Sequence, residues 1–123
     1  MRADEYLAAL ETLPIAGLAA LPGGFVVVAP HPDDESLGCG CLIAQALKLR
    51  REVRVIVVSD GCASHPNSRL YPHDRLRAVR EEETLRAVAE LGLAEKHVHF
   101  LRLPDSGVPK EGEEAEAAAR RIA

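Results

Sequence analysis

The side chains with the greatest chemical potential lie in one short stretch, Ala29-Pro30-His31-Pro32-Asp33-Asp34-Glu35. One imidazole and three carboxylates fall within five consecutive residues of it. Imidazole and carboxylate together are a common ligand set for a catalytic zinc that keeps an open coordination position. An ionised carboxylate that does not bind the metal can act as a general base. The stretch therefore predicts a metal site with a base beside it.

The elements on either side of this stretch favour a functional site. Residues 25–29 form a continuous apolar run rich in β-branched side chains, which predicts a strand covered on both faces. Residues 36–50 read as a helix that is apolar nearly all round and therefore largely buried. Ligands and catalytic groups collect where the strands of an open α/β sheet end. The acidic stretch stands at such a point.

Two prolines set the local geometry of the stretch. Pro30 and Pro32 hold the chain extended through His31 and keep the helix from starting early. Asp33 and Asp34 then fall at the helix N-terminus, whose partial positive charge favours ionised carboxylates. His31 and Asp34 are three residues apart across a bend and can converge on one ion, with Asp33 between them. The simpler interpretation is a helix cap beside a hydrogen-bonded histidine, but the position after the first long strand favours function.

The rest of the chain predicts a Rossmann-like, three-layer α/β sandwich with a mostly parallel sheet. After a helical segment at 3–21 that Pro14 interrupts, the order is β-α-β-α-β-α, with strands at 25–29, 53–59 and 97–103 and helices at 36–50, 74–91 and 112–123. We expect an N-terminal helical arm over 1–22 and one domain over 23–123. A doubly wound domain normally continues past such a helix, which favours a truncated domain over a short one that ends there.

Composition excludes several classes of partner. The formal net charge of -4 gives no basic footprint, so nucleic acid is not an expected partner. No run approaches the roughly 20 apolar residues of a membrane span. The first residues carry acids where an export signal needs positive charge, which predicts a cytoplasmic protein. Three cysteines, Cys39, Cys41 and Cys62, are interpreted as small buried residues in a reducing compartment.

The helix at 74–91 carries two charges in the row that should face the core. At 100° per residue one stripe contains Leu76, Arg80, Glu83, Ala87 and Leu91. Arg80 and Glu83 either form an ion pair at the edge of this stripe, or Arg80 is aimed into the site and held by Glu83.

Four further histidines are weaker candidates. His65 and His73 lie in a long polar loop at 61–73, a length typical of binding loops, although loop histidines are mostly solvated. His97 and His99 share one face of the third strand and are expected to be packed or hydrogen-bonded.

Residues Ala29 to Gly40 resemble the signature of the LmbE-like/PIG-L family of zinc-dependent N-acetylglucosamine deacetylases, with Pro30 as a departure from the usual Ala-His-Pro-Asp-Asp-Glu. Weaker matches follow in the family's order. They are Val57 to Gly61, with its Asp-Gly turn, Arg80 to Gly92, and Leu103-Pro104-Asp105-Ser106-Gly107. The resemblance covers roughly residues 24–110.

This resemblance implies a specific division of roles. His31 and Asp34 would be two of three protein ligands to Zn²⁺, and Asp33 would be the general base. Arg80 and Asp105 would bind the sugar or its attached group. The implied function is a zinc-dependent hydrolase, a metal-dependent amidohydrolase that removes the N-acetyl group from an N-acetylglucosamine-type sugar conjugate, a small-molecule partner.

The sequence offers no clear candidate for the third metal ligand, and this leaves the function open. In the family it is a histidine of a downstream His-x-x-His-like motif, and this chain ends before one. A loop histidine or a neighbouring subunit of a homo-oligomer could supply it. The alternative is a non-catalytic fragment or binding module of the same fold. A nucleotide binder is disfavoured, because Ile43 stands where a third glycine is required and the acids at 33–35 would repel a pyrophosphate.

Overall fold

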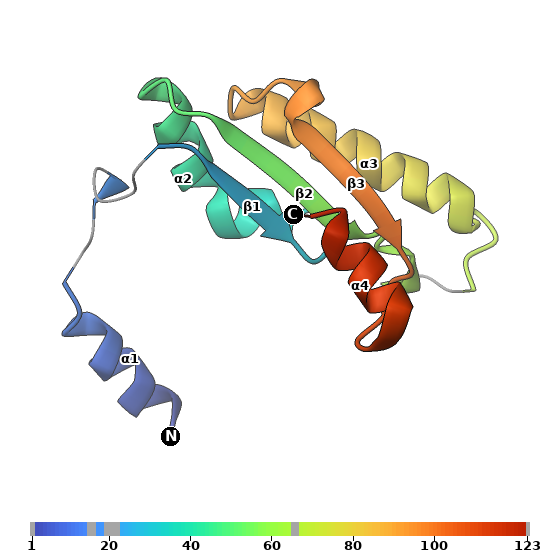
Figure 1. The fold of residues 1–123 in the computed structure, drawn as a ribbon, viewed down its shortest axis with the longest axis horizontal. Coiled ribbons are helices and arrows are strands. Elements are labelled where there is room, and N and C mark those ends of the chain that lie inside the picture. Colours follow the sequence, from blue (N-terminus) through green and yellow to red (C-terminus); the bar gives the residue numbers. More distant parts are fainter. Residues whose placement is uncertain (1, 15–16, 19–22, 65–66, 123) are drawn as a thin grey trace.

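The computed structural model describes residues 2–14, 17–18, 23–64 and 67–122 of the chain. Its centre is a parallel sheet of three strands in the spatial order β1-β2-β3 (Figure 1). The strands are β1 (Phe25–Ala29), β2 (Val53–Ser59) and β3 (Val98–Leu103). Val27 pairs with Val55, and Val57 with Phe100, before the register shifts between Val57 and Ser59.

Helices cover both faces of this sheet. α2 (Asp34–Lys48) and α3 (His73–Glu90) lie on one face, and α4 (Gly112–Arg120) lies on the opposite face (Figure 1). Short 3₁₀ helices also form within two of the connections, η2 (Cys62–Ser64) before α3 and η3 (Glu95–His97) before β3. The layers are therefore helix, sheet and helix, and the prediction of a Rossmann-like α/β fold with a parallel sheet is confirmed.

The hydrophobic core fills the space between the sheet and the α2–α3 layer. Its members are apolar residues from alternate strand positions, from the inner helix faces and from the segment that follows α3, namely Val27, Ala29, Ile43, Ala46, Val53, Val55, Val57, Val88, Leu93 and Val98. Removing a side chain such as that of Ile43 from water contributes roughly 1.5–3 kcal/mol. This core fixes the carboxyl ends of the strands relative to the first turns of α2 and α3.

The burial predictions for β1, for α2 and for Cys41, which is exposed, are wrong. Val26 and Val28 of β1 are 50% and 49% exposed, so this strand is covered on one face only. An apolar run shows that side chains can be buried but not how many layers cover them. Likewise, α2 is not buried all round, because Leu37 is 83% exposed while Ile43 and Ala46 face the core. It is an ordinary amphipathic helix.

Several helix boundaries also differ from expectation. α1 (Ala3–Glu11) ends well before residue 21, and part of the predicted extension, residues 15–16 and 19–22, lies outside the described residues. α2 begins at Asp34 and α3 at His73, each earlier than predicted. β3 begins at Val98 rather than at residue 97, which belongs to η3. Within the described ranges no helix is long and apolar enough to cross a membrane. The division into an arm over 1–22 and a domain over 23–123 stays a prediction.

Candidate active site

The carboxyl ends of the three parallel strands bring three polar segments to one edge of the sheet. Residues 31–34 follow β1, Asp60 follows β2 and Asp105 follows β3. Backbone hydrogen bonds join these segments. The Ser59 N–H donates to the Pro30 carbonyl at 3.0 Å, and the Asp60 N–H donates to the Leu103 carbonyl at 3.0 Å. The site therefore stands on strand ends that are held together by main-chain contacts.

His31 and Asp34 converge at this edge. His31 Nδ1 lies 3.3 Å from Asp34 Oδ2, and the backbone N–H of His31 donates to the same oxygen at 3.0 Å. Both side chains are about half exposed. Donor atoms that share a zinc ion with bond lengths of 2.0–2.2 Å lie roughly 3–3.5 Å apart. The pair therefore fits a divalent cation in both donor type and spacing.

Asp105 contacts the other nitrogen of the same imidazole. Its Oδ1 lies 3.3 Å from His31 Nε2, and its Oδ2 accepts the Ala63 N–H at 2.9 Å. A carboxylate in this position fixes the tautomer and orientation of a histidine whose other nitrogen binds a metal. The role that the resemblance implies for Asp105, substrate binding, stays a prediction, and these contacts add a role in orienting His31.

Asp33 is held in an uncommon backbone conformation. Its φ is 116°, a region that costs a non-glycine residue roughly 1–3 kcal/mol. Its N–H donates to Glu35 Oε2 at 3.0 Å, and its Oδ2 lies 3.2 Å from Arg80 Nη2. The side chain itself is about half exposed. Asp33 therefore has a fixed backbone and an accessible carboxylate.

Glu35 is the buried residue that stabilises this turn. It is fully buried, and Oε1 accepts the Ser36 hydroxyl at 2.9 Å while Oε2 accepts the Asp33 N–H. No separate role for Glu35 follows from the motif alone. Helical spacing could have indicated its burial. Glu35 lies eleven residues, or about three helical turns, before the apolar Ala46, so the two side chains share one face of the helix.

Arg80 reaches the site from α3. Its Nη2 donates to the Pro32 carbonyl at 2.8 Å and to Asp33 Oδ2 at 3.2 Å. The expected neighbour, Glu83, is exposed, so Glu83 does not lie in a buried row with Arg80. The buried positions of this helix are Leu76, which belongs to the predicted stripe, and Thr84 and Val88, which do not. Arg80 does point into the site, and its contacts there are with the β1–α2 turn.

Gly61 leaves the space that Arg80 occupies. Its φ is 64°, and a Cβ built there would lie 2.7 Å from Arg80 Nε and 2.9 Å from Pro32 Cδ. Any side chain would displace the guanidinium from Asp33. The Asp-Gly turn after β2 thus has a steric function in the site.

These residues line a cavity of about 410 Å³, large enough for a small molecule. His31, Asp33, Gly61, Arg80, Asp105 and Ser106 are part of its wall. It therefore brings together, with the exception of Asp34, the residues that the sequence selected for catalysis, metal binding and substrate binding.

The neighbouring Asp60 is a buried carboxylate with several donors. Burial raises its pKa, but the N–H groups of Cys62 and Asp105 and the nearby His73 outweigh burial, and its pKa lies below the ordinary value. Burial, and then the negative charge of Asp60, raise the pKa of the Cys62 thiol. Of the weaker histidine candidates, His73 contacts Asp60 at 3.0 Å, His99 is exposed on β3, His97 is partly buried in η3, and His65 lies outside the described residues.

The matches to known proteins agree with this arrangement. Residues 26–123 match the family model PIG-L, described as GlcNAc-PI de-N-acetylase. The chain belongs to this family. The resemblance drawn from the motif at residues 29–40 is thereby confirmed.

Two solved structures are similar to this PIG-L chain. One is the N,N'-diacetylchitobiose deacetylase from Pyrococcus horikoshii in complex with its inhibitor MPG, with 22% identity over 89% of this chain and a TM-score of 0.67. The other is the conserved protein TT1542 from Thermus thermophilus, with 30% identity over 79% of this chain and a TM-score of 0.57. The chain spans 41% of the length of each. No curated protein matches it.

Proposed function

We propose that this chain carries the metal-binding and general-base residues of a deacetylase, a zinc-dependent hydrolase that removes the N-acetyl group from an N-acetylglucosamine-type sugar conjugate. The observation that carries the proposal is the 3.3 Å approach of His31 Nδ1 to Asp34 Oδ2, with the fixed carboxylate of Asp33 between them in sequence. Membership of the PIG-L family supports the reaction class.

His31 and Asp34 would hold the zinc ion. Zinc bound there supplies Lewis acidity, which polarises an amide carbonyl and makes water more acidic. A catalytic zinc normally has three protein ligands. We propose that the third is a histidine, contributed by a loop, a later part of the protein or a neighbouring subunit of a homo-oligomer.

Asp33 would perform the proton transfers. It takes a proton from the water whose oxygen bonds to the acetyl carbon, and it gives that proton to the amine nitrogen as the C–N bond breaks. Acetate and the free amino sugar are the products. Arg80 Nη2, 3.2 Å from Asp33 Oδ2, would hold the carboxylate in one orientation.

Arg80 and Asp105 are proposed to contact the substrate as well as the catalytic residues. Both line the cavity beside His31 and Asp33. The Arg80 side chain is 21% exposed, which leaves part of it available to sugar hydroxyls or to the group attached to the sugar.

Asp33→Asn tests the proposed base. We expect acetate release from an N-acetylglucosamine conjugate to fall by roughly 10²–10⁴-fold while zinc content stays unchanged. Asp4→Asn, at an exposed position of α1, is the matched control and should keep both the acetate release and the zinc content of the wild-type chain. Full activity of Asp33→Asn with zinc bound would refute the assignment.

A binding module without catalysis is the second candidate. It is favoured by the number of ligands, because among the described residues His31 and Asp34 are not part of any group of three possible metal ligands. Metal analysis of the purified 123-residue chain and of its His31→Ala/Asp34→Ala variant separates the two functions. One equivalent of tightly held zinc that the variant loses supports the enzyme, and equal zinc contents of the two proteins support the module.

A further inference from the structure

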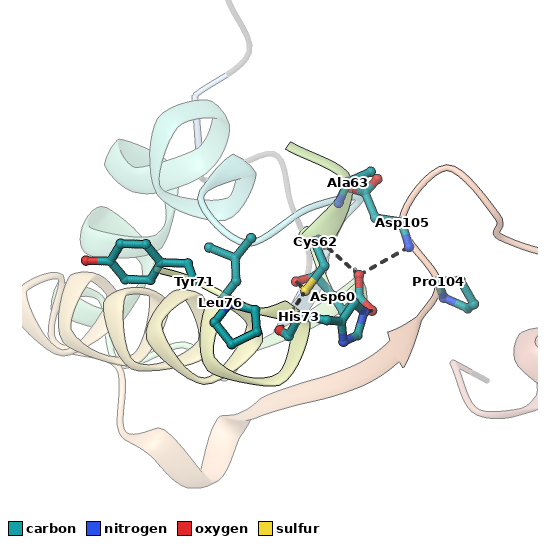
Figure 2. Close-up of a pocket in the computed structure, with 9 residues that line it drawn as sticks. Asp60, Cys62, Ala63, Tyr71, His73, Leu76, Pro104 and Asp105 are labelled. Carbon is teal, nitrogen blue, oxygen red and sulfur yellow. Dashed lines mark hydrogen bonds and ion pairs between the residues drawn. The ribbon is translucent and has the colours of Figure 1, made fainter. Parts of the chain in front are cut away.

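A second group of metal-ligating side chains lies beside the candidate active site. Asp60 follows β2, Cys62 begins η2, and His73 is the first residue of α3. One donor atom from each lies within 4.8 Å of the other two, and Asp60 Oδ2 is 3.0 Å from His73 Nε2. Figure 2 shows the three side chains gathered in one part of the pocket. Asp60 and Cys62 are each only 7% exposed.

We propose that Asp60, Cys62 and His73 form a binding site for a zinc-like divalent cation, separate from the pair His31 and Asp34. Thiolate sulfur, imidazole nitrogen and carboxylate oxygen are the donors that zinc takes in proteins. Around tetrahedral zinc such donors lie roughly 3.3–3.8 Å apart. Asp60 Oδ2 and His73 Nε2 are already near this spacing. The most widely separated pair of donor atoms needs to approach by at most about 1 Å.

The surroundings of His73 match those of a metal ligand. Its Nδ1 lies 3.5 Å from Asp74 Oδ1, on the side of the ring opposite Asp60. Histidines that bind a metal through one nitrogen commonly donate the other N–H to a carboxylate. Its side chain is more than half exposed, so it can move toward the sulfur without disturbing the core.

Asp60 has one oxygen available for the cation. Oδ1 accepts the N–H groups of Cys62 at 3.0 Å and of Asp105 at 3.2 Å, which fixes the carboxylate in place. Oδ2 faces His73. On binding, the cation replaces the proton of Cys62 Sγ, and also that of His73 Nε2 where the imidazole carries one. These protons pass to solvent.

The fourth coordination position would open into the adjoining cavity. This cavity has a volume of about 290 Å³, and Tyr71, Leu76 and Pro104 contribute to its wall beside the three ligands (Figure 2). A water molecule or a small ligand can occupy it. The cation would link the end of β2 to the start of α3 and steady Asp105, whose N–H binds Asp60.

A Co²⁺ titration of the 123-residue chain, with a non-thiol reductant, tests the site. We expect a thiolate-to-cobalt charge-transfer band whose limiting intensity corresponds to one Co²⁺ bound through a thiolate per chain. Cys62→Ser should abolish the band, and Cys41→Ser, an exposed thiol on α2, is the matched control that should keep it. The double variant His31→Ala/Asp34→Ala should also keep it, so the result does not depend on the proposed deacetylase function.

His73→Gln provides a variant at an exposed position should Cys62→Ser fail to fold. The affinity of this variant for Co²⁺, measured from the thiolate-to-cobalt band, should be lower by at least about tenfold. Three results would each overturn the proposal: no thiolate band in the wild-type chain at millimolar Co²⁺, a band that survives in folded Cys62→Ser, or unchanged affinity in His73→Gln.

Discussion

Replacement of Glu35 should show how much of the site's geometry depends on one buried carboxylate. Glu35 is fully buried and accepts hydrogen bonds from the Asp33 N–H and the Ser36 hydroxyl. In Glu35→Ala the loss of the bond to Asp33 costs about 1 kcal/mol, because Asp33 is exposed and water can reach it. The cavity left by the side chain adds about 2–3 kcal/mol. We therefore expect the free energy of unfolding to fall by about 3–4 kcal/mol.

Glu35→Gln separates packing from hydrogen bonding. Glutamine has nearly the same volume, and its amide oxygen can still accept the Asp33 N–H, while the Ser36 hydroxyl can rotate to accept from the amide nitrogen. The expected loss is about 1 kcal/mol. Urea unfolding at constant pH measures both variants, with Glu90→Ala, an exposed acid of α3, as the control within about 0.5 kcal/mol of wild type. If Glu35→Ala is no less stable than Glu90→Ala, Glu35 does not hold this turn.

Two further changes test the turn after β2. Gly61 has a φ of 64°, and the Cβ of Gly61→Ala would lie 2.7 Å from Arg80 Nε. This variant should lower the free energy of unfolding by about 1–2 kcal/mol and reduce acetate release. Gly38→Ala, where nothing lies within 4 Å of the new Cβ, should be neutral or stabilising in the same urea assay. Because its pKa is lowered in the folded state, ionised Asp60 adds stability above the unfolded value of about 3.8, and this stability is lost as the pH falls through the folded pKa. Asp60→Asn should therefore destabilise the protein at pH 7 and much less near pH 2, and an equal loss at both would contradict the pKa assignment.

The sequence was sufficient for features that depend on local pattern. β1 and β2 occupy the residues that their apolar runs predicted, and Gly92 follows α3 with a positive φ, as expected of a C-terminal glycine. His31 and Asp34, three residues apart across the β1–α2 turn, approach to 3.3 Å, as their spacing predicted, and their role as metal ligands stays a prediction. Each of these depends on residues that are neighbours along the chain.

Features that depend on tertiary packing could not be predicted in the same way. Periodicity placed Glu83 in the buried row of α3, but the helix is rotated so that Thr84 and Val88 face the core. The contact of Arg80 with Pro32 joins residues 48 apart. The approach of His73 to Asp60 likewise depends on how α3 packs beside the end of β2. Helical spacing gives the relative angles of side chains and leaves the orientation of the helix on the sheet undetermined.

Anomalous diffraction at the zinc edge, from crystals of this chain grown with excess zinc, shows whether His31 and Asp34 bind one ion. Zinc held by this pair gives a peak about 2.0–2.2 Å from both His31 Nδ1 and an Asp34 carboxylate oxygen. Imidazole and carboxylate groups turned away from each other, with no anomalous density between them, would contradict the proposal that His31 and Asp34 share a zinc ion.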